Sequence, residues 1–308
     1  MKTGFSLKHP PRVLITGGTG LLGKALLETA PAGLEVDAAF HQNPPPFPWH
    51  GRFHPLEICD EASVNGLMKK VEPHVVIHAA SIGSVDEAQR DPLQVKQVNV
   101  GGTRNLVQAC RLSGSFLVLV SSNAVFDGTL PPYAEDSPLR AANRYGEIKI
   151  EAEAVLRESG IAGLIVRPIL MYGWPFPNGR DNVVTRWLSH LEREETVEVA
   201  QDITSMPLSA LDCAQTIWAG IGAHCTGIVH VAGADRVSLV TFAKETARVF
   251  GCDERLIVPV PSSRLRGLAP RPRDTSFVTT RMQRELGIRP LGIREGLTLM
   301  QRSRALVS

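Results

Sequence analysis

Tyr145 and Lys149 are the two residues whose types and spacing most directly suggest chemistry. They stand four residues apart in the segment NRYGEIKIEAEAVLRESG at 143–160, so on a helix they would share one face. A phenol can donate a proton, and a nearby ammonium lowers its pKa, which is about 10 for a free tyrosine. The alternative is an ordinary tyrosine ring that packs along a lysine stem on a solvated helix. The pair alone does not decide between these interpretations.

Ser122 is a second candidate, because it follows the apolar run FLVLVS at 116–121. That run is typical of a buried strand, and ligands of open α/β sheets bind beyond the carboxyl ends of the strands. The alternative for Ser122 is a hydroxyl that only satisfies the backbone where the strand ends.

A glycine-rich turn lies in the segment RVLITGGTGLLGKALLE at 12–28, which is typical of a strand, a turn and a helix. Gly17, Gly20 and Gly23 repeat every three residues. Glycines at these positions let backbone N–H groups approach a pyrophosphate, and the helix N-terminus adds positive potential. The alternative is a mere tight turn. The setting between a strand and a helix favours a dinucleotide site.

The end of the second expected strand indicates which dinucleotide binds. An acidic residue there would hold the adenosine ribose and select NAD. This sequence has Phe40, His41 and Gln42 at that place, and Asp37 lies earlier, inside the strand. We therefore favour NADP(H), with NAD(H) as the alternative. His41 is a candidate neighbour of the 2′-phosphate, or else an ordinary surface histidine.

The elements that would position these residues alternate along the first half of the chain. Strand-like runs lie at 12–17, 34–40, 74–80, 115–122 and 164–173, and helical patterns lie at 20–29, 61–71, 98–113 and 143–159. Apolar strands separated by helices predict an α/β fold of the Rossmann type, a doubly wound parallel sheet. The segment 43–55 is proline-rich, and we expect it to be irregular.

The second half is less regular, which predicts a smaller C-terminal lobe that binds the substrate. We expect a dinucleotide-binding domain at 1–173 and a substrate-binding lobe over most of 174–308, with a strand at 227–233 that returns to the sheet. The helices expected in this half lie near 183–194, 209–221, 238–250 and 279–286.

Composition narrows the class of protein. Apolar residues make up 43% of the 308 positions and the net charge is +2, so nothing favours nucleic acid or an anionic membrane as a partner. No apolar run approaches the ~18–20 residues that span a bilayer. The N-terminus lacks the apolar centre of a signal peptide, and the five cysteines are scattered, so we expect a cytoplasmic protein with reduced thiols.

A metal site is not expected. Two histidine pairs, His50/His54 and His74/His78, have four-residue spacing. Neither pair lies on an expected helix, which that spacing needs to converge on one ion.

The ordered set of segments resembles the extended short-chain dehydrogenase/reductases, and within them the dTDP-4-dehydrorhamnose reductase group. The resemblance covers nearly the whole chain. Its segments are TGGTGLLG (16–23), LEICD (56–60), VVIHAAS (75–81), NVGGTRNL (99–106), SSNAVFDG (121–128), YGEIK (145–149), VRPILMYG (166–173) and RPRDTS (271–276).

The resemblance implies roles for individual residues. Tyr145 would protonate the oxygen of a ketone as hydride arrives, Lys149 would tune Tyr145 and bind the nicotinamide ribose, and Ser122 would hydrogen-bond the carbonyl. Cofactor contacts are implied for Gly17, Gly20, Leu21, Leu22, Gly23, His41, Glu57, Ile58, Ala79, Ala80, Ser81, Asn99, Tyr145 and Lys149. Substrate contacts are implied for Asn123, Ala124 and Arg271.

Two departures from the group fall on the substrate side. The chain has Ser122, Asn123 and Ala124 where the group usually has Thr-Asp-Tyr, and SMPLS at 205–209 where the group favours G-x-P-T. The resemblance therefore predicts NADPH-dependent reduction of a keto group on a nucleotide-activated deoxysugar, and leaves the sugar open.

Two other functions remain open. One is a nucleotide-sugar 4-epimerase, which uses the same fold and catalytic set. The other is a non-catalytic NADP-binding regulatory subunit, like the beta subunit of methionine adenosyltransferase. The resemblance is also compatible with a homodimer through the helices at 98–113 and 143–159.

Overall fold

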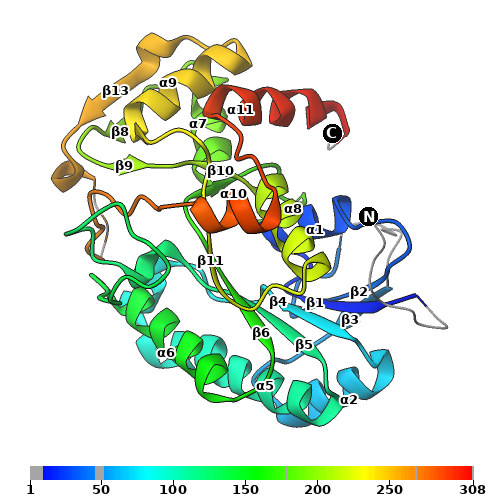
Figure 1. Cartoon of the computed structure of the whole chain (residues 1–308). Helices are drawn as coiled ribbons and strands as arrows, with labels where there is room; N and C mark the ends of the chain where they lie inside the picture. The colour runs from blue at the N-terminus through cyan, green and yellow to red at the C-terminus, as the bar shows by residue number, and fades with distance from the viewer. Residues whose placement is uncertain (1–9, 46–51, 178, 266, 268, 307–308) are drawn as a thin grey trace.

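Seven parallel strands form the central sheet of the computed structural model, which describes residues 10–45, 52–177, 179–265, 267 and 269–306 (Figure 1). In sheet order they are β11 (Gly227–Val231), β6 (Gly163–Pro168), β5 (Phe116–Val120), β4 (Val75–His78), β1 (Arg12–Thr16), β2 (Glu35–Phe40) and β3 (Arg52–Pro55). From β1 the chain runs outward to β3 and then returns to β4 on the other side of β1. The strand order therefore reverses between β1 and β4, where such sheets bind their ligands.

Helices cover both faces of this sheet. Figure 1 shows α2 (Glu61–Val71), α5 (Gly102–Ser113) and α6 (Arg144–Glu158) along one face, with α1 (Leu21–Glu28) and α8 (Ala210–Gly222) on the other. Successive side chains of β1 lie in the two apolar cores on opposite faces of the sheet: Leu14 packs with Leu106 of α5, and Ile15 packs with Leu22 of α1. Both side chains are almost fully buried, which explains why the strands read as continuous apolar runs.

A second group of elements has its own apolar core, which contains Trp187, Phe242 and Leu297. Its longer elements are α7 (Val183–Leu191), β8 (Val197–Ala200), α9 (Leu239–Phe250), β13 (Ile257–Val260) and α11 (Ile293–Arg302). Its shorter strands are β7 (Met171–Tyr172), β9 (Thr204–Ser205), β10 (Leu208–Ser209) and β12 (Val237–Ser238). Strand β13 pairs with β8, β10 with β7 and β12 with β9.

The remaining short elements connect these parts of the fold. They are α3 (Val85–Arg90), α4 (Pro92–Lys96), the π-helix η1 (Gln97–Gly101), α10 (Thr280–Leu286), and the 3₁₀ turns η2 (Asn123–Val125), η3 (Glu254–Leu256), η4 (Ser262–Arg264) and η5 (Ser303–Leu306).

The parallel α/β sheet expected from the sequence is confirmed, and several boundaries differ. Residues 46–51 of the proline-rich segment lie outside the described residues, but 52–55 form β3, so the expectation of an irregular segment there was wrong. The strand expected at 164–173 ends at Pro168, and the next two-residue strand pairs outside the main sheet. Strand β11 pairs with β6 in the main sheet. The domain division near residue 173 stays a prediction.

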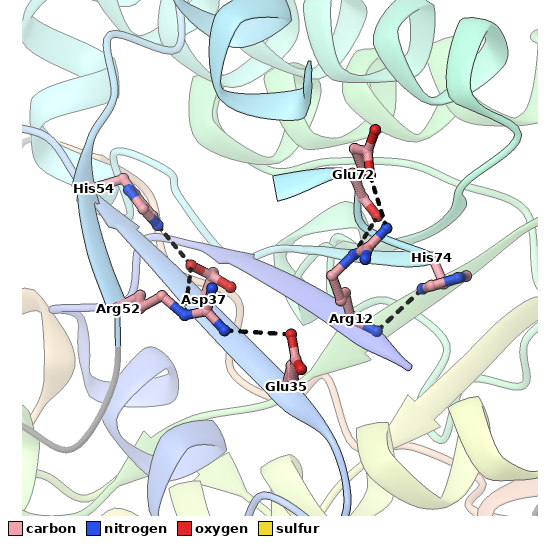
Figure 2. Close-up of polar contacts among 7 residues, drawn as sticks. All are labelled: Arg12, Glu35, Asp37, Arg52, His54, Glu72 and His74. Atoms are coloured by element: carbon pink, nitrogen blue, oxygen red, sulfur yellow. Dashed lines mark hydrogen bonds and ion pairs between the residues drawn. The ribbon is translucent and has the colours of Figure 1, made fainter. Parts of the chain in front are cut away.

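A polar cluster holds the edge strand β3 (Figure 2). His54 of β3 and Asp37 of β2 are both buried, with Nε2 of His54 2.6 Å from Oδ1 of Asp37. Nearby, Nδ1 of His74 accepts a hydrogen bond from the Arg12 backbone N–H at 3.1 Å. These histidines therefore have polar partners within the sheet, while His50 lies outside the described residues.

Candidate active site

The glycine turn after β1 is packed so tightly that side chains would not fit. Gly17 has φ +71°, and a Cβ there would lie 2.7 Å from the backbone nitrogen of Ala80. A Cβ on Gly23 would lie 2.3 Å from the carbonyl oxygen of Gly17. Glycine is therefore required at both positions, because only glycine takes a left-handed backbone at little cost and allows such close approach.

A cleft of about 320 Å³ opens beside this turn. Eight of the predicted cofactor residues line it: Gly17, Gly20, His41, Glu57, Ile58, Ala79, Ala80 and Ser81. Residues not anticipated from the sequence complete the lining, among them Thr19, Asn43 and Val98. A larger hollow of about 490 Å³ lies away from these residues, between α6 and the edge strand β11.

A contact between a histidine and a glutamate forms part of the cleft wall. Nε2 of His41 lies 2.9 Å from Oε2 of Glu57, and the other carboxylate oxygen accepts a hydrogen bond from the Cys59 backbone N–H at 3.0 Å. The Cys59 hydrogen bond, together with the nearby His41, keeps the pKa of Glu57 below its usual value. The histidine predicted to meet a 2′-phosphate thus already has a carboxylate partner.

Three of the predicted cofactor residues lie in structural positions. The side chains of Leu21 and Leu22 pack in the core, so any cofactor contact from them would come from their backbone. Asn99 is buried in η1, and its amide exchanges two hydrogen bonds with the backbone of Ile82, at 2.9 and 3.1 Å. Asn99 therefore fixes the segment that carries Ser81.

Tyr145 lies near the start of α6, with 8% of its surface exposed. Its phenol forms hydrogen bonds with the hydroxyls of Ser122 and Ser81. Burial nevertheless raises the pKa of Tyr145, against the effect of these bonds and of the positive charge of Arg180. The phenol is therefore held protonated, as a proton donor must be. The contributions of Ser81 and Arg180 could not be read from the sequence.

Lys149 is almost fully buried one turn after Tyr145, and its ammonium donates to the carbonyl oxygen of Val120 at 2.8 Å. Burial lowers the pKa of Lys149 to about 8, against the opposing effect of the Glu153 carboxylate. The sequence suggested that Lys149 would lower the pKa of Tyr145. In the structure desolvation of the phenol is the largest effect and the pKa is raised, so the tuning role of Lys149 stays a prediction.

Ser122 caps the turn η2, where its Oγ accepts from the Ala124 backbone N–H at 3.1 Å. The same hydroxyl donates to Oδ1 of Asn123 at 3.3 Å, and the Asn123 amide donates to the hydroxyl of Thr275 at 2.6 Å. A polar chain therefore connects Ser122 to the segment at 271–276, which was singled out in the sequence for Arg271 rather than for Thr275.

The Arg271 side chain is held by contacts with other protein groups. Its guanidinium donates to Oδ2 of Asp86 at 2.8 Å and to the carbonyl oxygen of Ala269 at 3.2 Å. These contacts hold the segment around Arg271 against α3. The role predicted for Arg271 in substrate binding therefore requires that the ligand compete with Asp86.

The described residues contain neither a metal-binding cluster nor a membrane-spanning helix. Across the part of the chain that the structure describes, no group of three or more His, Cys, Asp or Glu residues is arranged to hold a metal ion. Within the same residues, no helix combines the length and apolar character needed to cross a bilayer.

Comparisons with known proteins agree with this geometry. The family described as the RmlD substrate binding domain matches residues 11–305. A dTDP-4-dehydrorhamnose reductase of Streptomyces griseus is 33% identical over 91% of this chain and 90% of its own length. Methionine adenosyltransferase 2 subunit beta of Xenopus laevis is 36% identical over 53% of this chain and 47% of its own.

The solved structures give the same result. A dTDP-4-dehydrorhamnose reductase from Bacillus anthracis in complex with NADP has a TM-score of 0.84 and 26% identity, over 94% of this chain and 98% of that one. A UDP-glucose 4-epimerase from Thermus thermophilus has a TM-score of 0.82 at 24% identity, over 94% and 98% of the two chains, and shares the fold. The chain belongs to the extended short-chain dehydrogenase/reductases, in the branch of the dTDP-4-dehydrorhamnose reductases.

Proposed function

We propose that this protein uses NADPH to reduce a keto group on a nucleotide-activated deoxysugar. The observation that carries the proposal is the buried phenol of Tyr145, which two serine hydroxyls orient beside the glycine-lined cleft. Membership of a family whose relatives include dTDP-4-dehydrorhamnose reductases supports the choice of substrate class.

The residues present fit a dinucleotide. The close approach of Gly17 to Ala80 leaves backbone rather than side chains at the turn, as a pyrophosphate site requires. Glu57 and Ile58 would border the adenine, and His41 would meet the 2′-phosphate after exchanging its Glu57 partner. The NADP complex of the Bacillus anthracis relative supports NADP(H), with NAD(H) as the alternative.

The proton transfer follows from the protein groups. When bound, NADPH supplies a hydride to the carbonyl carbon. Tyr145 would donate its proton to the carbonyl oxygen, and Ser122 would hydrogen-bond the same oxygen and keep it in reach. The phenolate left on Tyr145 would be stabilised by the Ser81 and Ser122 hydroxyls and by the charge of Arg180, with Lys149 one turn further along α6. The product is a secondary alcohol, and Tyr145 regains its proton from solvent.

The test is turnover with a panel of nucleotide 4-keto-sugars, measured as the oxidation of NADPH. We expect Tyr145→Phe to reduce kcat by roughly 10²–10⁴-fold, the usual contribution of a general acid, while NADPH binding stays within about twofold. Tyr133→Phe is the matched control, because Tyr133 packs against Phe126, in the core. Full turnover by Tyr145→Phe would refute the proposed acid.

A regulatory subunit is the second candidate, because half of the chain matches methionine adenosyltransferase 2 subunit beta. This candidate would be favoured if the protein bound NADPH but did not oxidise it with any keto-sugar, and if a stoichiometric enzyme partner was recovered with it. Tightly retained NAD and interconversion of two sugars without net oxidation would instead favour an epimerase.

We also propose that most of 174–308 forms the substrate lobe and that the chain dimerises through α5 and α6. Leu112, at the end of α5, is 73% exposed, which supports an interface there. Light scattering on the purified protein tests this proposal, and a monomer at high concentration would contradict it.

A further inference from the structure

Glu153 is a fully buried carboxylate that the proposed proton transfer does not use. It lies one turn beyond Lys149 on α6 and has 0% of its surface exposed. Its partner is Arg167 of β6, which is 1% exposed. Nε and Nη2 of Arg167 donate to the two carboxylate oxygens at 2.9 and 2.7 Å, in a bidentate pair.

This ion pair is connected to the strand that carries Ser122. The hydroxyl of Ser121, at the end of β5, donates to Oε1 of Glu153 at 2.5 Å. Nη1 of Arg167 lies 3.2 Å from Nε2 of His230 on β11. One carboxylate thus holds α6 to the end of β5 and, through Arg167, to two further strands. Such a network fixes positions firmly, because each member is buried and satisfied.

The Glu153 carboxylate also acts on Lys149 through its charge. Tyr145 and Glu153 lie one turn away on either side along α6. Arg167 pairs with Glu153, and His78 of β4 is near enough to be affected by the charge of Lys149. Burial and the charge of Lys149 lower the pKa of His78 to about 3, so that ring is neutral at physiological pH. Glu153 is the negative charge that favours the ammonium of Lys149 over the neutral amine.

We propose that Glu153 is a positioning residue for the reaction, whose carboxylate keeps Lys149 protonated and aligns the Ser122 strand with the Tyr145 helix. The inference rests on the proposed function for the roles of Ser122, Tyr145 and Lys149. Arg167 holds the carboxylate in place, and Ser121 transmits its position to the neighbouring Ser122.

The experiment is an NMR titration of the lysine side chains in the full-length protein without substrate or cofactor. Lys149→Met identifies the Lys149 signal by its loss. We expect Glu153→Gln to lower the pKa of Lys149 by about one pH unit, since an opposite charge has been removed. The alkaline limit of kcat should move down by the same amount. Ser121→Ala is the matched control, which loses one hydrogen bond, keeps the carboxylate and should leave Lys149 unchanged.

Glu153→Gln leaves the Arg167 guanidinium buried without a counter-ion and could prevent folding. The double variant Glu153→Leu/Arg167→Met removes both charges, and we expect a smaller fall in the same direction, because the lost guanidinium opposed the carboxylate. A folded variant in which Lys149 titrates as in the wild type would overturn the inference. So would a wild-type Lys149 that is neutral at about pH 7. The titration needs no substrate. If Glu153→Gln shifts the pKa of Lys149 but the wild type turns over no keto-sugar, that result would count against the proposed function alone.

Discussion

Gly146 lies directly against the carbonyl oxygen of Ala124: a Cβ on Gly146 would be only 2.0 Å from that oxygen. The Ala124 backbone N–H donates to the hydroxyl of Ser122, and Gly146 directly follows Tyr145. The contact therefore fixes how closely the segment with Ser122 approaches the helix with Tyr145. It explains a glycine inside the first turn of α6, where glycine costs helix stability.

We predict that Gly146→Ala separates these two segments. The added methyl group has no room, so we expect a loss of about 1–3 kcal/mol in the free energy of unfolding and a fall in kcat of at least tenfold. Gly66→Ala on α2 is the control, because nothing lies within 4 Å of a Cβ there. That variant should gain about 0.5–1 kcal/mol from helix propensity. Denaturant unfolding measures the change in stability, and initial rates measure the change in kcat. Equal changes in the two variants would contradict the assigned contact.

A second prediction concerns the glycine turn. Gly17 and Gly33 both have positive φ, +71° and +86°, but only a Cβ on Gly17 would meet neighbouring atoms within 4 Å. Each alanine should cost about 1–2 kcal/mol of stability for the left-handed backbone. Only Gly17→Ala should weaken NADPH binding, by tenfold or more, because the turn must move away from Ala80. Fluorescence titration measures the NADPH affinity of both variants. An unchanged affinity in Gly17→Ala would show that the turn does not hold the cofactor.

A third prediction tests the polar chain from Thr275 to Ser122. Thr275→Val removes the acceptor of the Asn123 amide, so the Asn123 side chain is free to turn and Ser122 loses its fixed orientation. We expect kcat to fall about tenfold, a loss comparable to one hydrogen bond, with NADPH affinity unchanged. Thr246→Val makes the same replacement in α9, where the hydroxyl donates to the Phe242 carbonyl oxygen of the same helix. A kcat loss of equal size in Thr246→Val would indicate a general effect of stability.

Local patterns explain why the sheet and cofactor cleft could be predicted. Apolar strands and the glycine spacing act over a few residues, and eight predicted cofactor residues do line one cleft. The substrate side depends on distant partners instead. Arg271 is held by Asp86, 185 positions away, and the two-residue strand β7 exists only through its pairing with β10. The raised pKa of Tyr145 likewise follows from burial, which no spacing in the sequence reveals.

The last prediction concerns Asp212 of α8, which accepts a hydrogen bond from the Leu291 backbone N–H. Burial raises the pKa of Asp212 from 3.8 to about 6. The folded state then holds this proton more tightly than the unfolded state, so the contribution to stability is fully present below about pH 4 and is lost as the pH rises through about 6. At neutral pH the loss is at most about 3 kcal/mol.

Asp212→Asn keeps an acceptor for Leu291 and removes the buried charge. We therefore expect a higher melting temperature than wild type at about pH 7 and no gain at about pH 4. Asp253→Asn is the control of opposite sign, because hydrogen bonds from Arg255 lower the pKa of Asp253, and its loss should destabilise the protein only at the higher pH. Thermal unfolding at both pH values decides the matter. A gain for Asp212→Asn that is equal at the two pH values would mean that packing, rather than the charge, limits stability at this position.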